Sequence, residues 1–492
     1  MKKGIVCVLL LAVMLSTASC QEKQANTPET TDPSVLLSSD DTSGETQEEI
    51  REVLPDETYD GYTIRIMMRP GLQTNWPSDM FSDGETADTI EDAVFRRNEK
   101  VSERMDVNFQ LILSSNWNRE TDAMASILSN SDDYDIIVPH ARASFDYAAN
   151  DVLVDWHDLP WVDLSKPWWD QDAASSFTIN GKLYQMTGDI SYFSLAETGC
   201  MVFNKKLFND RNYDYPYDSV LNNTWTFEQF ATLATSCSDD LNGDGKRKPA
   251  DDLYGYVSYQ WIGPMNALVT GGGRIVDKDG DGEPYLSINT ERNQTVFEKY
   301  FDLVDQEMCY LEPYRADGTN YFDNRMMFKE SRALFMACNL DDISYLRDME
   351  DDFGIVPIPK FDESEPTYHM NVDAGTNMFV IPITASDLDR TSAVLEALAA
   401  EGYRTVTPAY YEIALQGKYS RDEVSIQMLD IIRTCRVFDL GYYFTNLGGG
   451  FGSIGHDLVN YKDHNFASFC AANEKATLKK MAKVLDKYGM GS

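Results

Sequence analysis

Cysteine and histidine are scarce in this chain of 492 residues. The eight cysteines form no CxxC pair and no Cys/His spacing suited to zinc, and the five histidines are scattered. Sparse cysteines in a large body are typical of buried thiols, so no disulfide is predicted. The HExxH, GxSxG and P-loop lysine motifs are also missing. With no motif that supports catalysis, we predict that the chain is not an enzyme.

Basic side chains are few as well. Lysine and arginine number 42 against 80 aspartates and glutamates, a net charge of −38 at pH 7. Such an excess of negative charge argues against nucleic acid, anionic lipid and other polyanionic partners. It fits neutral or cationic ligands, although solubility alone explains it equally well.

The chain has one leader-like apolar run, residues 5–15, which follows two lysines. It is too short to span a bilayer core of about 30 Å. Small residues at 17–19 precede Cys20, the pattern of a lipoprotein signal peptide covering residues 1–19. We predict cleavage before Cys20, a lipid on its sulfur, and a lipid-anchored protein on the extracellular face of the cytoplasmic membrane. The alternatives are an ordinary secretory signal with an incidental cysteine and an uncleaved anchor.

Residues 20–59 are rich in Ser, Thr, Asp, Glu and Pro. This composition buries too little apolar surface to offset chain entropy, which predicts a disordered tether. As a flexible coil it would reach about 35 Å. The remaining body of roughly 430 residues exceeds one ordinary core and indicates two domains.

The body begins with alternating strand and helix patterns. Residues 63–68 carry an apolar side chain at every second position, and 107–113 do the same. Helical spacing runs through 88–104 between them, and again around 124–128 before the apolar strand 134–138. Strands joined by helices in this order predict a largely parallel sheet.

A second region of the same kind follows. Residues 200–204 read as a strand, and Trp225 and Thr226 precede a helix, with Thr226 and Gln229 spaced as a capping box. Trp225 is therefore expected to be structural. Later expected elements are the strands 355–358 and 378–381 and the helix 391–402.

Several segments together resemble one family. GCMVFNKKLF at 199–208 is similar to a YNKxLF stretch, and FGIVPIP at 353–359 is similar to a GVVPIPK strand, both of the extracellular solute-binding proteins of ABC importers. Segments that follow the same family order are 224–230, 240–245 and 254–256, and 395–412 resembles a clostridial-type branch. The chain thus resembles the maltose-binding-like sugar-binding family 1 over residues 60–445.

The resemblance implies an α/β fold of the periplasmic-binding-protein-like type II, with two lobes joined by hinge strands. Crossings are expected near 189–199 and 373–377. Lobe 1 would comprise 60–195 plus 378–415, and lobe 2 would comprise 196–377 plus 416–492. The implied function is a membrane-anchored substrate-binding component that captures a carbohydrate or oligosaccharide between the lobes and delivers it to the permease subunits of an ABC importer.

Aromatic residues make up 12% of the chain. Sugar rings stack on flat aromatic faces, while acids and amides bind their hydroxyl groups. Candidate ligand-binding residues on expected loops and crossings are Trp76, Trp117, Tyr192, Glu197, Trp261, Tyr368 and Asp373. Simple packing is the alternative for each of them. A second tryptophan group is expected to be core, and it comprises Trp156, Trp161, Trp168 and Trp169.

One acidic loop has the spacing of a calcium loop. Oxygen-bearing side chains stand at its first, third, fifth and twelfth positions, with a glycine at the sixth and a backbone carbonyl offered by the seventh. The corresponding metal ligands are Asp240, Asn242, Asp244, Lys246 and Asp251. A structural Ca²⁺ is therefore predicted, with a solvated turn as the alternative. The similar run 277–282 is expected to be a hairpin turn.

Two further functions stay open at this point. Eighty acidic residues include many pairs that could act as in a glycosidase, so an extracellular glycan-degrading enzyme is one alternative. A lipoprotein that senses a ligand without importing it is the other.

Overall fold

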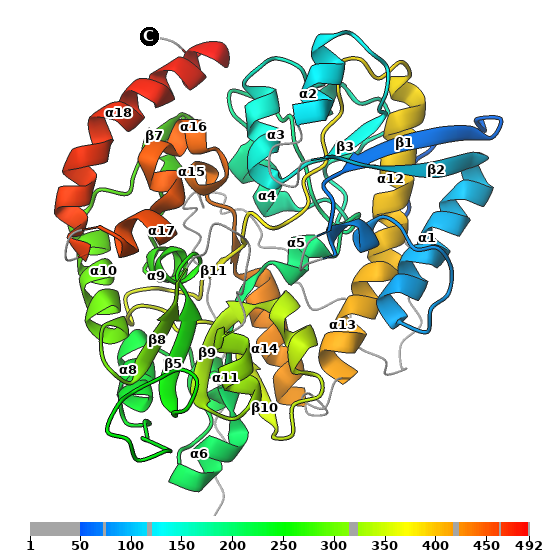
Figure 1. Cartoon of the computed structure of the whole chain (residues 1–492). Coiled ribbons are helices and arrows are strands. Elements are labelled where there is room, and N and C mark those ends of the chain that lie inside the picture. Colours follow the sequence, from blue (N-terminus) through cyan, green and yellow to red (C-terminus); the bar gives the residue numbers. More distant parts are fainter. Residues whose placement is uncertain are drawn as a thin grey trace, which may run out of the picture. The chain divides into compact units, whose positions relative to one another are not determined.

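The two larger β-sheets that the structure describes are separate, and each is packed against its own helices (Figure 1). The computed structural model describes residues 50–71, 75–115, 121–313, 323–416, 423–461 and 464–490. The predicted leader and most of the predicted tether lie outside these residues. No helix within the described ranges is both long enough and apolar enough to cross a membrane. We call the parts built around the first and second sheet lobe 1 and lobe 2.

Lobe 1 contains a parallel sheet in the order β2-β1-β3. Tyr62 in β1 pairs with Val107 in β2, and Ile66 pairs with Ile136 in β3. The strands are β1 (Tyr62–Met68), β2 (Val107–Leu113) and β3 (Ile136–Val138). The first helices are η1 (Trp76–Asp79), α1 (Thr89–Met105), α2 (Thr121–Leu128), α3 (Ala141–Ala148), η2 (Trp156–Asp158), α4 (Gln171–Phe177) and α5 (Phe193–Ala196). The prediction of alternating strands and helices in a parallel sheet is confirmed.

Tryptophans fill part of the core of lobe 1. Trp156, Trp168 and Trp169 are each at most 1% exposed, and Trp161 is partly buried against them. The indole groups of Trp168 and Trp169 donate to Glu396 at 3.1 and 2.8 Å. The core assignment of this group is confirmed.

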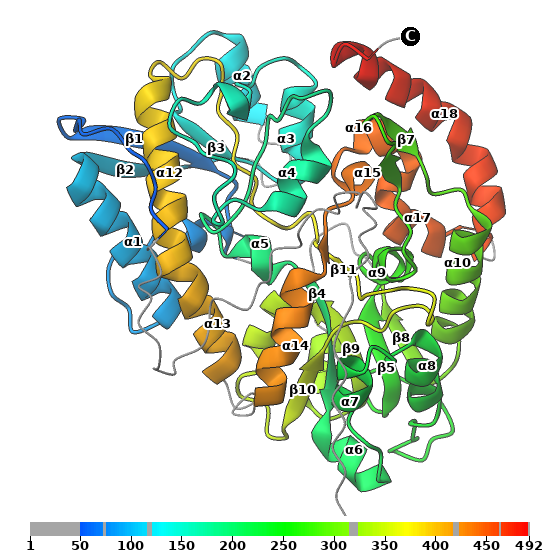
Figure 2. The same cartoon turned by 180° about the vertical axis from the view of Figure 1, so that it is seen from behind.

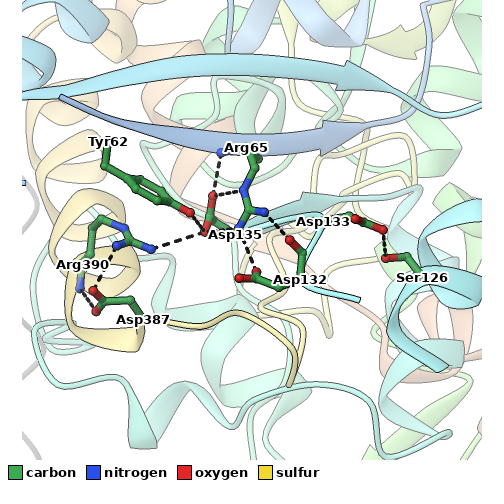
Figure 3. A network of polar contacts seen from close by, with 8 residues as sticks. All are labelled: Tyr62, Arg65, Ser126, Asp132, Asp133, Asp135, Asp387 and Arg390. Carbon is green, nitrogen blue, oxygen red and sulfur yellow. Dashed lines mark hydrogen bonds and ion pairs between the residues drawn. The ribbon is translucent and has the colours of Figure 1, made fainter. Parts of the chain in front are cut away.

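A buried carboxylate ties the sheet of lobe 1 to a later helix (Figure 3). Asp135 is fully buried and accepts from Arg65 Nε at 3.0 Å and from the Tyr62 hydroxyl at 3.1 Å. The Arg390 guanidinium lies 3.4 Å from the Tyr62 ring centre and 3.7 Å from Asp135. Removing one partner of such a buried group would leave the others unsatisfied, so this network fixes α12 (Leu388–Arg404) on the sheet.

Lobe 2 contains a mixed sheet in the order β10-β4-β9-β5-β8. β4 is antiparallel to both β10 and β9, whereas β5 is parallel to β9 and β8. The strands are β4 (Gly199–Asn204), β5 (Tyr254–Tyr259), β8 (Cys309–Glu312), β9 (Ala333–Asn339) and β10 (Phe353–Val356). Its helices include α6 (Lys205–Arg211), α7 (Tyr217–Leu221), α8 (Phe227–Thr235), α9 (Gly263–Thr270), α10 (Glu291–Val304), α11 (Asp323–Lys329) and η3 (Leu340–Leu346).

The start of α8 confirms one expectation and corrects another. Trp225 is 1% exposed and donates to the Pro357 carbonyl at 3.1 Å, so its structural role is confirmed. The expected capping box is wrong, because the Thr226 side chain makes no cap hydrogen bond. Thr226 instead forms a bridge with Lys360, whose carbonyl accepts from Phe227 N.

The chain returns to lobe 1 and then to lobe 2 after β10 (Figure 2). α12 and α13 (Val406–Gln416) contact α1, and α14 (Glu423–Thr434) contacts β10. The expected strand 378–381 is an extended segment with isolated antiparallel bridges, among them Val380 to Ile137. Between the lobes, β11 (Met370–Asn371) pairs in parallel with β12 (Arg436–Val437).

The described residues after β12 form a helical segment. It comprises α15 (Leu440–Tyr443), α16 (Thr445–Gly448), η4 (Gly449–Ser453), α17 (Ile454–Val459) and α18 (Phe466–Lys487). α17 contacts α9, and α15 contacts both α3 of lobe 1 and β6 (Val276–Lys278) of lobe 2. β6 forms a hairpin with β7 (Pro284–Leu286), so the expected turn at 277–282 is confirmed.

The segment before β1 is attached to lobe 1 through Glu52. Its side chain is 5% exposed and forms ion pairs with Arg104 at the end of α1 and with Arg404 at the end of α12. Burial opposes ionisation of Glu52, but the hydrogen bonds from Arg404 and Arg104 lower its pKa to about 2. The chain that leads into the fold is thus held where these two helices end.

Replacing Glu52 with glutamine is expected to lower the free energy of unfolding by about 2 kcal/mol at pH 7. Because the folded pKa lies below the ordinary value near 4.5, this contribution is present above pH 4.5 and is lost as the pH falls toward 2. Urea unfolding of both proteins between pH 7 and pH 3 measures it. Glu85→Gln is the control, because Glu85 and its partner Arg96 are exposed. An equal difference at pH 7 and pH 3 would contradict the ionic origin.

Candidate functional site

The candidate site surrounds the crossing segment 372–377, which connects the two lobes. Val372 forms a bridge with Thr198, directly before β4, and Asn377 forms one with His140 of lobe 1. Arg436 and Val437 in β12 pair with β11 just before this segment. Side chains from both lobes therefore converge on one short stretch of backbone.

Three of the predicted ligand-binding residues are joined into one hydrogen-bonded chain. Trp261 Nε1 donates to the Tyr442 hydroxyl at 2.8 Å, and that hydroxyl donates to Asp373. The backbone N–H of Asp373 donates to the Glu197 carbonyl at 2.8 Å. Glu197 Oε2 in turn accepts from Asn339 Nδ2 at 2.9 Å. The side-chain hydrogen bonds run from Trp261 to Asp373, and the backbone of Asp373 then connects to the backbone of Glu197, whose buried carboxyl pairs with Asn339.

Glu197 has an unusual electrostatic environment. It is 7% exposed, and burial together with the nearby carboxylates of Asp373 and Asp341 raises its pKa well above the ordinary value. A carboxyl group with a raised pKa keeps its proton to a higher pH than usual, and in the protonated form it can donate a hydrogen bond as well as accept one. Asp341 is affected in the same way, since burial and Asp342 raise its pKa to about 6.

A second group lies on the lobe 1 side of the crossing. Arg69, at the end of β1, donates to the Gly375 carbonyl and to Asn377 Oδ1 at 3.1 Å, and its guanidinium lies 3.8 Å from the Trp76 ring centre. Asn377 Nδ2 donates to Asp79 at 2.8 Å. Trp76 and the crossing segment are therefore held by the same buried cation.

Tyr192 joins this second group through Asp79. Its backbone N–H donates to Asp79 Oδ1 at 2.8 Å, and its hydroxyl lies 3.1 Å from Ser78 Oγ. Its ring stacks on Tyr410 with centres 5.4 Å apart. Burial raises the pKa of Asp79 to about 6, against the hydrogen bonds from Ser191 and Asn377.

Arg142 links the two lobes directly at the first group. It belongs to α3 of lobe 1, and its guanidinium lies 5.0 Å from the Trp261 ring centre and 4.5 Å from that of Tyr442. It also donates to the Gly452 carbonyl at 2.8 Å. The Arg142 guanidinium thus lies against both aromatic rings, and Tyr442 is 1% exposed.

Two predicted ligand-binding residues are not part of these groups. Tyr368 is 4% exposed, and its hydroxyl donates to the Val220 carbonyl at 3.2 Å within lobe 2. Trp117 lies outside the described residues. The structure brings five of the seven candidates to the crossing, namely Trp76, Tyr192, Glu197, Trp261 and Asp373.

Sequence reasoning missed the residues that connect these five. Tyr442 follows β12, more than 60 positions after Asp373, and no local pattern links the two. Asn339 ends β9, and only the pairing of Gly199 with Asn339 brings it beside Glu197. Arg69 is a charge directly after an apolar strand, which is the one local signal that could have marked it.

The predicted calcium loop is closed by its own hydrogen bonds. Asp240 accepts from Gly245 N at 2.7 Å, and Asp244 accepts from Lys246 N at 2.9 Å. Asp244 also pairs with Lys248 at 2.5 Å. Within the described ranges, no three His, Cys, Asp or Glu side chains gather closely enough to hold a metal ion. The Asn242 side chain accepts from Asp244 N at 2.9 Å. Calcium binding by this loop, with Asp251 at its twelfth position, stays a prediction.

The sequence matches no protein-family model and no curated protein. Solved structures do match. A cyclo/maltodextrin-binding protein complexed with maltotetraose has a TM-score of 0.53 at 13% identity, covering 90% of this chain and 98% of that one. A solute-binding protein of an ABC transporter from Thermotoga lettingae, bound with α-D-tagatose, has a TM-score of 0.53 at 13% identity, covering 86% and 100%.

The maltose/maltodextrin-binding domain MalE from Bdellovibrio bacteriovorus, bound to maltotriose, has a TM-score of 0.51 at 14% identity, covering 87% and 99%. This chain has the two-lobed fold of periplasmic solute-binding proteins. The fold class expected from the sequence is confirmed. In such a fold the lobes meet at the crossing segments, which is where the Glu197, Asp373 and Trp261 side chains gather.

Proposed function

We propose that this protein is the membrane-anchored substrate-binding component of an ABC importer and that it captures a carbohydrate or oligosaccharide between its two lobes. The observation that carries the proposal is the chain from Trp261 through Tyr442 and Asp373 to Glu197. It links the Trp261 indole to the Asp373 carboxyl through Tyr442, near the point where the lobes join. Sugars need both, because their C–H faces stack on rings and their hydroxyl groups pair with carboxyls.

Electrostatics supports a neutral ligand. A site in which every carboxyl group is ionised would favour a cationic ligand. Burial, however, raises the pKa of Glu197 well above its ordinary value, which disfavours the charged form of this group. A protonated Glu197 is an uncharged hydrogen-bonding group, suited to a hydroxyl. The three similar structures described above are of proteins bound to sugars.

A thermal-shift screen tests the ligand class. Maltotriose, maltotetraose and tagatose are compared with peptides and polyamines at equal concentration. A sugar present at 100 times its Kd is expected to raise Tm by about 3 °C for a domain of this size. If peptides alone raise Tm, the carbohydrate assignment is wrong.

The importer role, the lipid anchor on Cys20 and the location on the extracellular face of the membrane belong to the same proposal. Deleting this protein from its native cells is expected to abolish uptake of the radiolabelled sugar found in the screen. Restoring a Cys20→Ala form tests the anchor, since that form should leave the membrane fraction. Normal uptake in cells without the protein would instead favour a sensor.

One observation favours a second function, a glycan-degrading enzyme. Glu197 has a raised pKa and lies beside the carboxylate of Asp373, and such a pair can serve as acid and base. Incubation with labelled oligosaccharides tests it. We expect no release of reducing ends, whereas release that disappears in Glu197→Gln would establish the enzyme.

We further propose that the loop at 240–251 binds Ca²⁺ after displacing Lys248 from Asp244. Isothermal titration with Ca²⁺ on chelator-treated protein is expected to show heat. Lys248→Ala is expected to tighten binding about threefold or more, because it removes a competing cation. Lys206→Ala is the matched control, since Lys206 forms the same kind of exposed i,i+4 pair with Asp210. No heat in either Lys248 form would dismiss the calcium site.

A further inference from the structure

Two of the six cysteines in the folded body lie side by side in lobe 2. Cys200 in β4 and Cys338 in β9 have their sulfur atoms 3.7 Å apart, and both are free thiols at most 1% exposed. They stand directly opposite each other in the antiparallel register of these strands. The remaining cysteines are Cys237, Cys309, Cys435 and Cys470, all free and all but Cys435 buried.

We infer that Cys200 and Cys338 form a disulfide bond when this protein folds in an oxidising compartment. Residues directly opposite in antiparallel strands have Cα atoms about 4.5–5.5 Å apart, within the range of about 4.4–6.8 Å that disulfides require. The sulfur atoms need to approach by less than 2 Å, which side-chain rotation supplies without moving the strands. The presence of an oxidant rests on the proposed extracellular location, whereas the ability to bond rests on geometry.

The reaction is a thiol–disulfide exchange with a disulfide oxidant such as oxidised glutathione or a protein disulfide. One cysteine thiolate attacks a sulfur of the oxidant and releases a thiol. The second thiolate then attacks the mixed disulfide, forming the Cys200–Cys338 bond and releasing the second thiol. Two cysteine protons are lost, and the two electrons reduce the oxidant to two thiols.

The bond has to form before lobe 2 closes around it. Both sulfur atoms are buried, and the hydrogen bond between the Cys338 and Cys200 thiols together with burial raises the pKa of Cys338 well above its ordinary value. Little thiolate is therefore available in the folded protein. We therefore expect the two thiols to be oxidised during folding, and we expect their oxidation in the folded protein to be slow.

The position of the bond connects it to the candidate site. Cys338 precedes Asn339, which donates to Glu197, and Cys200 follows the crossing at Thr198. A covalent link across β4 and β9 would hold these two strands in register next to Thr198, where the crossing segment meets lobe 2. It would close a loop across 138 positions of sequence.

Refolding tests the bond independently of the cell. The full chain is denatured, reduced, and refolded in a buffer of reduced and oxidised glutathione, then alkylated under denaturing conditions and mapped without reduction by mass spectrometry. We expect a peptide linked through Cys200 and Cys338, with the other four cysteines of the body alkylated. Full alkylation of both Cys200 and Cys338 would overturn the inference.

Thermal melting supplies a second readout. The oxidised protein is expected to melt roughly 5 °C above the same protein refolded with reductant. Cys338→Ser should abolish this difference, and Cys309→Ser, a buried thiol without a neighbouring sulfur in β4 or β9, should retain it. An equal difference in Cys338→Ser would overturn the inference. The comparison in the unchanged protein needs no variant to fold.

Alkylation of the protein inside its native cells tests the compartment separately. A linked pair in cells supports both the bond and the location. The refolded protein could form the bond while the protein from cells has both thiols free. That result would support the ability of Cys200 and Cys338 to bond and would contradict the extracellular location.

Discussion

Replacing Trp261 with alanine is expected to weaken carbohydrate binding by about 100-fold while the protein stays folded. The indole supplies the flat face at one end of the site, and truncating an aromatic residue at the centre of a binding site typically costs 2 kcal/mol or more. Its Nε1 donates to Tyr442, which also holds Asp373, so the loss affects the orientation of a carboxylate as well. Isothermal titration with the sugar found in the screen measures the change.

A second variant of Trp261 separates the contribution of its ring from that of its hydrogen bond to Tyr442. Trp261→Phe keeps an aromatic face without the N–H and is expected to lose much less affinity than alanine. Trp161→Ala is the matched control, because Trp161 is a partly buried tryptophan of lobe 1 that donates to Asp389. An unchanged Kd in Trp261→Ala would remove this residue from the site.

Arg69→Met is expected to lower the free energy of unfolding by about 3–5 kcal/mol. Arg69 is fully buried, and its hydrogen bonds hold the Gly375 carbonyl and Asn377 to the end of β1. Methionine fills a similar volume but leaves those acceptors without their buried donor. Urea denaturation at pH 7 measures the loss.

The matched variant is Arg69→Lys. It keeps the positive charge but lacks the planar guanidinium group that reaches two acceptors. It is expected to recover part of the stability. Affinity for the sugar should fall in Arg69→Met as well, because Arg69 positions Trp76 and the crossing segment together. Equal stability of Arg69→Met and the unchanged protein would show that the crossing is held by other contacts.

Local patterns were sufficient for several elements of the fold. The alternating apolar residues of β1 and β2 and the helical spacing of α1 predicted a parallel sheet, because those periods reflect which face of a strand or helix is buried. Glycine-rich and acidic turns such as 277–282 were also readable. The capping box at Thr226 failed, and the structure instead pairs Thr226 with Lys360, a residue far along the chain that no local pattern indicates.

The candidate site was readable only as separate residues. Trp261, Glu197 and Asp373 were selected because each follows or flanks an expected strand or crossing, and that alone could not show whether they meet. Tyr368 met the same criteria, yet its side chain packs in lobe 2. The connecting residues Tyr442 and Asn339 carry no local signature.

The sequence by itself determined the secondary-structure periods and the acidic composition, because these depend on which residue types recur at which spacing, and its resemblance to a known family implied the two-lobed fold. Only the tertiary structure decided which side chains share the crossing and which two cysteines lie opposite each other. The physical reason is that hydrogen bonds and sulfur contacts depend on distances between positions far apart in the chain, such as Cys200 and Cys338. Those distances are set by strand pairing and lobe packing, and spacing along the sequence does not contain them.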